Sequence, residues 1–200
     1  MHSYQTLEKR LDLEKPLPIS ENWTAAADFL HLLADYCLRE KPENIVECSS
    51  GASTLVLSRC CQLNKKGRVY SLENGPEFVQ QARSQLDAFG LSDFARVYHA
   101  PLKDYLLRER KFQWYDLTHF YPGEIDLLVI DGPPGLLQKH ARYPALPLLG
   151  SYLARRCLVF LDDAARADER DIVSCWLEEH AEFETEYVDT ERGCSVLIRR

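Results

Sequence analysis

The apolar residues of the chain gather in five short runs that are separated by longer amphipathic stretches. The runs are residues 44–48, 68–73, 95–99, 125–130 and 157–161. Two segments, IDLLVI and CLVFL, are apolar almost throughout instead of alternating with polar residues, which is typical of parallel strands covered on both faces. Helical periodicity fills most of the stretches between the runs. The pattern therefore predicts an α/β fold with a doubly wound, mostly parallel sheet.

Three segments depart from this central pattern. Residues 1–19 are mostly polar and contain two prolines, so we predict an N-terminal arm that leads to Ser20 as the cap of a first helix. Residues 111–124 show the least regular pattern of the chain. Residues 183–200 hold two extended segments around a polar turn at Gly193, which predicts an antiparallel hairpin. With the five apolar runs, this hairpin makes a seven-stranded, Rossmann-like sheet.

Length and composition favour one domain. The chain has 200 residues, of which 46% are hydrophobic, and this is enough for one sizeable core. We therefore expect a single domain over residues 20–200. The net charge of −7 provides no broad positive surface for a phosphate backbone, so we expect no nucleic acid partner.

The sequence indicates neither a membrane segment nor an export signal. The N-terminal residues lack the apolar core of a signal peptide, and no apolar run approaches the ~20 residues that span a bilayer. The seven cysteines lie mostly within apolar runs and lack the spacing of a zinc site, so we expect buried free thiols. Together these features predict a cytoplasmic protein.

Acidic residues end four of the five predicted strands. They are Glu47, Glu73, Asp131, and Asp162 with Asp163. Ligands of an open parallel sheet bind beyond the carboxyl ends of its strands, so these acids are candidate site residues. A small-residue turn and a helix follow Glu47, and Glu73 has the spacing from that turn at which a strand-helix-strand unit presents a carboxylate to a ribose.

These residues together resemble class I S-adenosylmethionine-dependent methyltransferases, and the resemblance covers nearly all of the chain from about residue 20. The first motif of that family, an acid followed by a glycine-rich turn, is matched by ECSSGAST at residues 47–54. The acid that closes its second strand is matched by Glu73, and the acid that ends its fourth strand is matched in IDLLVIDGPPG. The segments RYPALPLL and LDDAARADER look like a bacterial small-molecule subgroup distantly similar to catechol-type O-methyltransferases.

The resemblance implies S-adenosylmethionine as the cofactor and assigns residues to its parts. Backbone amides at the helix start, with the hydroxyl of Ser53 or Thr54, would receive the methionine carboxylate, and strand-end acids would take the ammonium. Glu73 would accept both ribose hydroxyls; its alternative role is a charge at the start of the next helix. The complete predicted set is Glu47, Cys48, Ser49, Gly51, Ser53, Thr54, Glu73, Asn74, Asp131 and, around the adenine, Ala100, Pro101 and Leu102.

The chain departs from the family at Ser49, which stands where the first glycine usually lies. We expect the Ser49 side chain to crowd the cofactor or to force a different turn.

Three of the strand-end acids form a candidate metal site. Asp131, Asp162 and Asp163 end two strands that would lie ~4.8 Å apart, so their oxygens are expected to converge on a magnesium-like ion. In catechol-type relatives a similar trio binds the metal that lowers the pKa of a substrate hydroxyl. The alternative is that Asp163 caps the next turn and that Asp131 only contacts the cofactor.

Methyl transfer also requires a group that accepts the proton lost by the acceptor. Asp131 and His140 are the candidates, and Lys139, Arg142 and Tyr143 could hold a substrate anion or ring. We predict transfer to a small-molecule acceptor, with oxygen favoured as the receiving atom. Two alternatives stay open: a nicotinamide-dependent oxidoreductase, which the turn opposes because it lacks repeated glycines, and a non-catalytic cofactor-binding module on the same fold. The sequence leaves the oligomeric state open.

Overall fold

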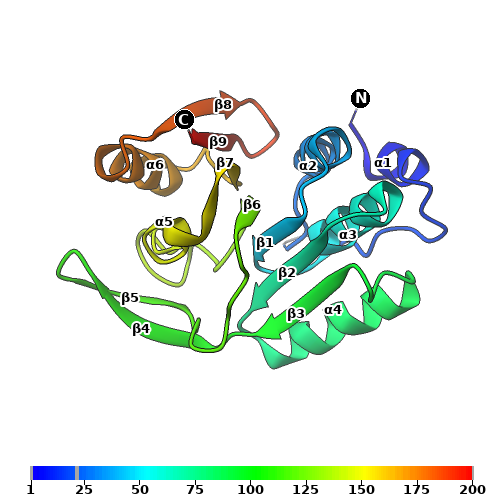
Figure 1. The fold of residues 1–200 in the computed structure, drawn as a ribbon, viewed down its shortest axis with the longest axis horizontal. Coiled ribbons are helices and arrows are strands. Elements are labelled where there is room, and N and C mark those ends of the chain that lie inside the picture. Colours follow the sequence, from blue (N-terminus) through cyan, green and yellow to red (C-terminus); the bar gives the residue numbers. More distant parts are fainter. Residues whose placement is uncertain (1, 21–22, 200) are drawn as a thin grey trace.

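The structure, a computed structural model, describes residues 2–20 and 23–199. Its centre is a seven-stranded sheet in the order β3-β2-β1-β6-β7-β9-β8 (Figure 1). The strands are β1 (Asn44–Cys48), β2 (Arg68–Glu73), β3 (Ala95–His99), β6 (Ile125–Ile130), β7 (Leu153–Leu161), β8 (Phe183–Val188) and β9 (Cys194–Arg199). The neighbours from β3 to β7 are parallel, and β9 pairs antiparallel with both β7 and β8. The predicted fold class and the C-terminal hairpin are confirmed.

Four of the five apolar runs become strands with the predicted bounds, and the fifth is longer. Strand β7 begins at Leu153, before the apolar run at 157–161. Arg155 and Arg156 are exposed within its first half, and these two charges interrupt the apolar pattern from which the strand was predicted.

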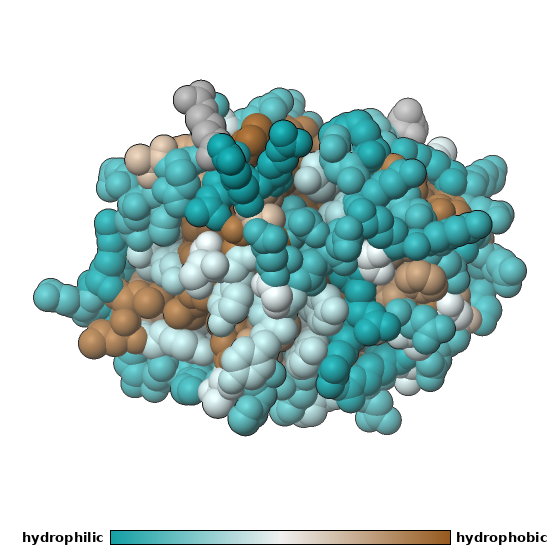
Figure 2. All heavy atoms as spheres, in the orientation of Figure 1, coloured by the Kyte–Doolittle hydropathy of each residue, from teal (hydrophilic) through white to brown (hydrophobic). Residues whose placement is uncertain are grey.

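Helices cover both faces of the sheet, as the continuously apolar strands predict. The helices are α1 (Tyr4–Arg10), α2 (Ala27–Glu40), α3 (Ala52–Asn64), α4 (Pro76–Ala88), α5 (Ala145–Leu149) and α6 (Ala167–Glu179), with a short 3-10 helix at Gly150–Tyr152. Helices α1 to α4 pack on one face, and α5 and α6 pack on the other (Figure 1). Ile45 and Val46 are consecutive in β1 and belong to the two opposite cores. Figure 2 shows the outer surface in this view, where hydrophilic residues dominate and apolar ones are scattered.

A second hairpin precedes and partly overlaps the stretch 111–124, which has the least regular pattern in the sequence. Strands β4 (Leu102–Leu107) and β5 (Arg110–Tyr115) pair antiparallel and place Trp114 in the core on the side of α5 and α6. The two-residue turn is Arg108–Glu109, and both residues have positive φ. Such turns are usually marked by Asn or Gly. Because this turn carries neither, the sequence pattern did not reveal the hairpin.

The predicted N-terminal arm contains a helix that the sequence pattern did not indicate. Helix α1 has a capping box between Ser3 and Thr6, and its Leu7 is fully buried against the α2 side of the sheet. The prediction that Ser20 caps the following helix is wrong. Helix α2 begins at Ala27, where its apolar periodicity sets in, and the backbone N–H of Ser20 instead donates to the hydroxyl of Thr24 at 2.7 Å. Residues 21 and 22 lie outside the described part of the chain.

All seven cysteines are free, and all but Cys175 are buried, as predicted. Within residues 2–20 and 23–199, no helix combines the length and the apolar character that crossing a bilayer requires. The cytoplasmic location stays a prediction.

Candidate active site

The parallel strands β1, β2, β6 and β7 bring the predicted acids to one edge of the sheet. Glu47 lies next to last in β1, Glu73 ends β2, and Asp131 directly follows β6. Asp162 and Asp163 follow β7, which pairs with β6. All of them lie at the carboxyl ends of the strands, where an open α/β sheet binds its ligands.

Glu47 is buried, and only one of its two carboxylate oxygens has hydrogen-bond partners in the described part of the chain. Its Oε2 accepts hydrogen bonds from the Thr54 hydroxyl at 2.6 Å and from the Ser71 hydroxyl at 2.8 Å, whereas Oε1 has no partner among the described residues. Burial raises the pKa of Glu47 to about 7, although the hydroxyls of Thr54 and Ser71 act in the opposite direction. The Oε1 atom is therefore available to a ligand that carries hydrogen-bond donors or positive charge.

The turn after β1 has the backbone of a glycine-rich loop although only one of its residues is glycine. Ser49 has φ of 109° and Gly51 has φ of 156°, both in the region that side chains disfavour. A Cβ atom added to Gly51 would meet nothing within 4 Å, so the backbone there is open to close approach. The turn thus has a backbone conformation that favours glycine. Ser49 adopts this conformation at the cost of backbone strain.

The Thr54 hydroxyl forms hydrogen bonds within the turn. It donates to Glu47 and accepts the backbone N–H of Gly51 at 3.0 Å, so both of its functions are used within the turn. Thr54 thus orients Glu47 and closes the loop. The amides at the start of α3 that remain for an anionic group are those of Ala52 and Ser53.

Glu73 is nearly buried and connects the first turn to the end of β2. Its Oε2 accepts a hydrogen bond from the Ser50 hydroxyl at 3.0 Å, and its Oε1 accepts one from the backbone N–H of Gly75 at 3.0 Å. Gly75 is the N-cap of α4, so the helix-start contact weighed as an alternative is present as well. The contact with Ser50 places Oε2 beside the turn that carries Gly51.

The other predicted cofactor residues also lie at this edge. Cys48 and Ala100 are buried, Asn74 and Leu102 are half-buried, and Pro101 is exposed between β3 and the hairpin strand β4.

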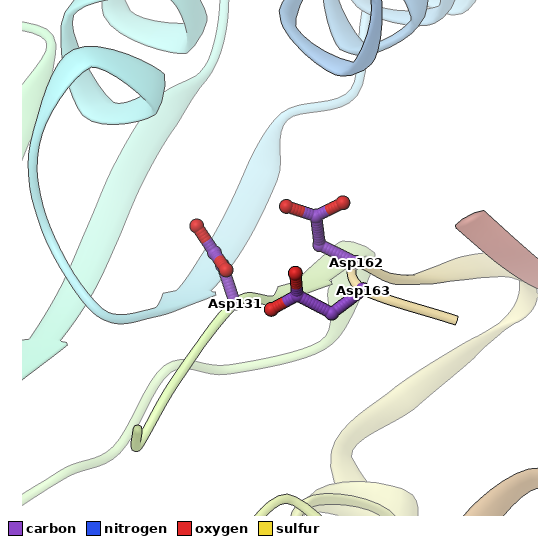
Figure 3. A group of neighbouring side chains, drawn as sticks. All are labelled: Asp131, Asp162 and Asp163. Atoms are coloured by element: carbon purple, nitrogen blue, oxygen red, sulfur yellow. The ribbon is translucent and has the colours of Figure 1, made fainter. Parts of the chain in front are cut away.

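Asp131, Asp162 and Asp163 converge as predicted. One carboxylate oxygen of each lies within 4.8 Å of the others. In Figure 3 the Asp163 side chain extends toward Asp131, while the Asp162 carboxylate projects away from that of Asp163. Burial raises the pKa of Asp131 to about 6, and burial together with repulsion from Asp131 and Asp163 raises the pKa of Asp162 well above its ordinary value. Neither oxygen of Asp162 has a hydrogen-bond partner within the described chain.

The guanidinium of Arg142 lies within this acid cluster. Its Nη2 donates to Asp131 Oδ1 at 3.2 Å and to Asp163 Oδ2 at 2.7 Å, and the side chain is 3% exposed. The trio therefore meets the distances of a metal site, but two of its three members already hold a cation. The sequence named Arg142 only as a holder of a substrate anion, because no local pattern indicates that a loop residue reaches the ends of two strands.

A cavity of about 730 Å³ opens beside this cluster. Its lining contains Ser49, Asp131 and Arg142, and also Trp23, Lys139 and Arg192. A smaller cavity of about 270 Å³ is lined by Ser50, Gly51 and Ala52, and Trp23 borders both cavities. Trp23 and Arg192 were missed at the sequence level. Arg192 could have been noted, because it lies in the polar turn of the predicted C-terminal hairpin.

His140 and Tyr143 lie outside the lining of the larger cavity. The backbone N–H of His140 donates to Asp168 at 2.6 Å, and its ring lies 3.4 Å from Arg110 of β5. The Tyr143 hydroxyl donates to Glu179 of α6. The structure therefore brings Asp131 and Lys139 to the cavity but leaves His140 in a contact between the loop, the hairpin and α6.

Comparisons with known proteins agree with this geometry. A family model described as a methyltransferase domain matches residues 46–164, more than half of the chain. No curated protein matches at the level of sequence.

Solved structures share the fold at low sequence identity. A methyltransferase of Podospora anserina with S-adenosylhomocysteine bound is 14% identical with a TM-score of 0.71, and the match covers 98% of this chain and 87% of that one. An O-methyltransferase of Bacillus cereus, also in complex with S-adenosylhomocysteine, is 16% identical with a TM-score of 0.69 and coverage of 98% and 88%. A structure described as a putative caffeoyl-CoA O-methyltransferase of Staphylococcus aureus is 14% identical with a TM-score of 0.67 and coverage of 99% and 92%.

These comparisons do not favour the nicotinamide-dependent alternative. The match of the family model, the strand order and the strand-end acids agree, and the chain belongs to the methyltransferase family, with the fold of the class I S-adenosylmethionine-dependent enzymes.

Proposed function

We propose that the chain transfers a methyl group from S-adenosylmethionine to an oxygen atom of a small-molecule acceptor. The observation that carries the proposal is the unpartnered Oε1 of the fully buried Glu47, next to the open backbone at Gly51. A buried carboxylate in this state favours a cationic ligand, and the methionine ammonium is such a group. When bound, S-adenosylmethionine supplies a methyl group on a positively charged sulfur, which a nucleophile can attack.

The chain offers groups for the remaining parts of this cofactor. The amides of Ala52 and Ser53 at the start of α3 would receive the methionine carboxylate. Glu73 would accept the ribose hydroxyls, which would then replace the Ser50 hydroxyl that now donates to it. Ala100, Pro101 and Leu102 would border the adenine, and Asn74 lies beside them at the end of β2.

Asp131 is the proposed acceptor of the proton. It lies in the lining of the larger cavity, and its raised pKa of about 6 leaves it ionised at neutral pH while making it a stronger base than an ordinary aspartate. His140 takes no part in this step, because it does not line the cavity. The predicted magnesium ion is left out as well, because Arg142 already donates to Asp131 and Asp163.

The cavity favours an acceptor that carries an acidic group. Lys139 and Arg192 line it, and neither forms an ion pair or a side-chain hydrogen bond with the described residues. The backbone of Arg192 is fixed, because its carbonyl accepts the N–H of Ala165 at 3.0 Å. An acceptor with a carboxylate or phosphate would be held by these two cations with its hydroxyl directed toward Asp131.

Cofactor binding can be tested with two glycine variants that share the same backbone problem. Gly51 and Gly90 both have positive φ, and an added Cβ would meet nothing within 4 Å at either position. Calorimetric titration with S-adenosylhomocysteine should show binding to the wild type and to Gly90→Ala, and binding at least about tenfold weaker to Gly51→Ala, a loss of about 1.4 kcal/mol. Equal affinity of all three proteins, or no binding to the wild type, would contradict the proposal.

Acceptor chemistry can be tested with matched compounds. In the presence of labelled S-adenosylmethionine, 3,4-dihydroxybenzoate should be methylated faster than catechol, and glucuronate or glucose 6-phosphate faster than glucose. The preference for the anionic member of each pair should disappear in Arg192→Gln. Methylation of the neutral members at the same rate would contradict the role of Arg192, while leaving methyl transfer itself supported.

A further inference from the structure

Arg142 is built into the strand ends that carry the acid cluster. Besides its contacts to the carboxylates of Asp131 and Asp163, its Nη2 donates to the backbone carbonyl of Asp131 at 2.8 Å, and its Nη1 donates to the backbone carbonyl of Asp162 at 2.8 Å. The side chain is almost fully buried. A guanidinium held by two main-chain carbonyls as well as two carboxylates is a structural part of the site, because moving it would take this donor from all four acceptors, and of these only Asp163 Oδ2 would keep another arginine of the described chain, Arg166.

This position is incompatible with a divalent ion that is shared by Asp131 and Asp163. Such an ion would bind through both carboxylates, and Nη2 already takes one oxygen of each, so that only the other oxygen of each carboxylate is left for the ion. The ion would also lie within a few ångströms of a charged guanidinium, at a depth where repulsion between like charges is weakly screened. Metal binding would therefore require that Arg142 leave the cluster.

We propose that Arg142 is the permanent cation of this cluster and that the chain takes no divalent metal ion between Asp131 and Asp163. One consequence rests on the proposed function: in methyl transfer, the guanidinium would supply the fixed positive charge beside the acceptor hydroxyl, since Arg142 lines the larger cavity. The part that concerns metal binding stands without it.

The free oxygens of the cluster explain why removing Arg142 should create a metal site. Both oxygens of Asp162 and the Oδ1 of Asp163 have no hydrogen-bond partner within the described chain. Without the guanidinium, the oxygens that now accept from Nη2 would join them, and three carboxylates within 4.8 Å of one another match the ligands that Mg²⁺ and Mn²⁺ prefer.

Arg166 provides a matched control. Its Nη1 lies 2.9 Å from the same Oδ2 of Asp163 that Arg142 contacts, but its side chain is half exposed. Arg166→Gln therefore removes one arginine from that carboxylate and leaves Arg142 between Asp131 and Asp163.

The test is Mn²⁺ binding to the full chain, measured by electron paramagnetic resonance and calorimetry without any methyl donor or acceptor. Arg142→Met should bind one Mn²⁺ at least about tenfold more tightly than the wild type and Arg166→Gln, and adding Asp162→Asn to Arg142→Met should abolish this binding. Tight Mn²⁺ binding to the wild type that is lost in Asp162→Asn would overturn the proposal. Failure of Arg142→Met to gain binding would also overturn it, because the arginine would then not be what excludes the ion.

If Arg142→Met does not fold, a measurement on the wild type shows whether a divalent ion displaces Arg142. The Arg142 side-chain resonances in a ¹⁵N spectrum should keep their positions and slow hydrogen exchange when magnesium is added in large excess. Loss or displacement of these resonances on addition of magnesium would show that the ion replaces the guanidinium. Because neither measurement involves S-adenosylhomocysteine, a failed cofactor titration leaves this result interpretable by itself.

Discussion

Replacing Glu47 with glutamine is expected to remove a pH-dependent loss of stability from the protein. Burial raises the pKa of Glu47 from 4.5 to about 7. Between these two values the folded chain binds more protons than the unfolded chain, so the free energy of unfolding falls as the pH rises. The neutral form of Glu47 gives its full contribution below pH 4.5, and this contribution is lost above about pH 7.

The size of the effect follows from the pKa difference. At 1.36 kcal/mol for each pKa unit, ionising Glu47 in the folded chain costs about 3 kcal/mol of stability. Glutamine can still accept hydrogen bonds from Thr54 and Ser71, but its amide NH₂ group would take the place of the unpartnered Oε1. This buried group without a partner should lower the free energy of unfolding by about 1 to 3 kcal/mol at every pH. The difference in pH dependence between the two proteins therefore isolates the ionisation better than their absolute stabilities do.

The assay is urea unfolding of the wild type and of Glu47→Gln at intervals from pH 4.5 to pH 8.5. The stability of the variant relative to the wild type should improve by about 3 kcal/mol across this range. Glu178→Gln, which changes an exposed carboxylate on α6, should follow the wild type in parallel. Parallel curves for Glu47→Gln and the wild type would refute the reasoning that Glu47 is ionised at a cost.

Three further substitutions test other parts of the account. Ser49→Gly should raise the melting temperature by roughly 2–6 °C, because relief of the backbone strain at φ of 109° outweighs the added freedom of the unfolded chain. Ser49→Ala should not raise it. Equal melting temperatures of the two variants would show that Ser49 is not strained. His140→Gln removes the ring contact with Arg110 and should therefore lower stability in calorimetry, but it should change the methyl-transfer rate less than about threefold. Asp131→Asn should lower that rate by about 10²-fold or more, and a similar loss in both variants would show that His140 is a catalytic residue. Leu7→Ala should lower the free energy of unfolding by about 2 to 5 kcal/mol in urea unfolding, and a change below about 1 kcal/mol would show that the packing of α1 contributes little to stability.

The strands and the acids at their ends could be predicted because both depend on local patterns. Continuously apolar runs indicate buried strands wherever they occur, and parallel strands bring their carboxyl ends to one edge whatever the loops do. This is why Glu47 and Glu73 were found beside the turn of Gly51, and why Asp131 and Asp163 were expected to meet.

The parts that were missed depend on contacts between distant segments. The hairpin of β4 and β5 has a turn of Arg108 and Glu109, whose residue types do not mark a turn, and its Trp114 is buried in the core that α5 and α6 share. Arg142 reaches two strand ends from a loop, and nothing in RYPALPLL indicates that its guanidinium would be held there. The contact of His140 with Arg110 likewise joins two segments that are 30 residues apart.

A crystal structure of the chain grown with S-adenosylhomocysteine tests the central claim most directly. We expect the ligand at the carboxyl edge of the sheet, with its ammonium on Glu47 Oε1, its ribose hydroxyls on Glu73, and the Ser50 hydroxyl displaced from that carboxylate. A ligand bound elsewhere, or a Glu73 that keeps its bond to Ser50 while the ribose lies outside its reach, would contradict the account.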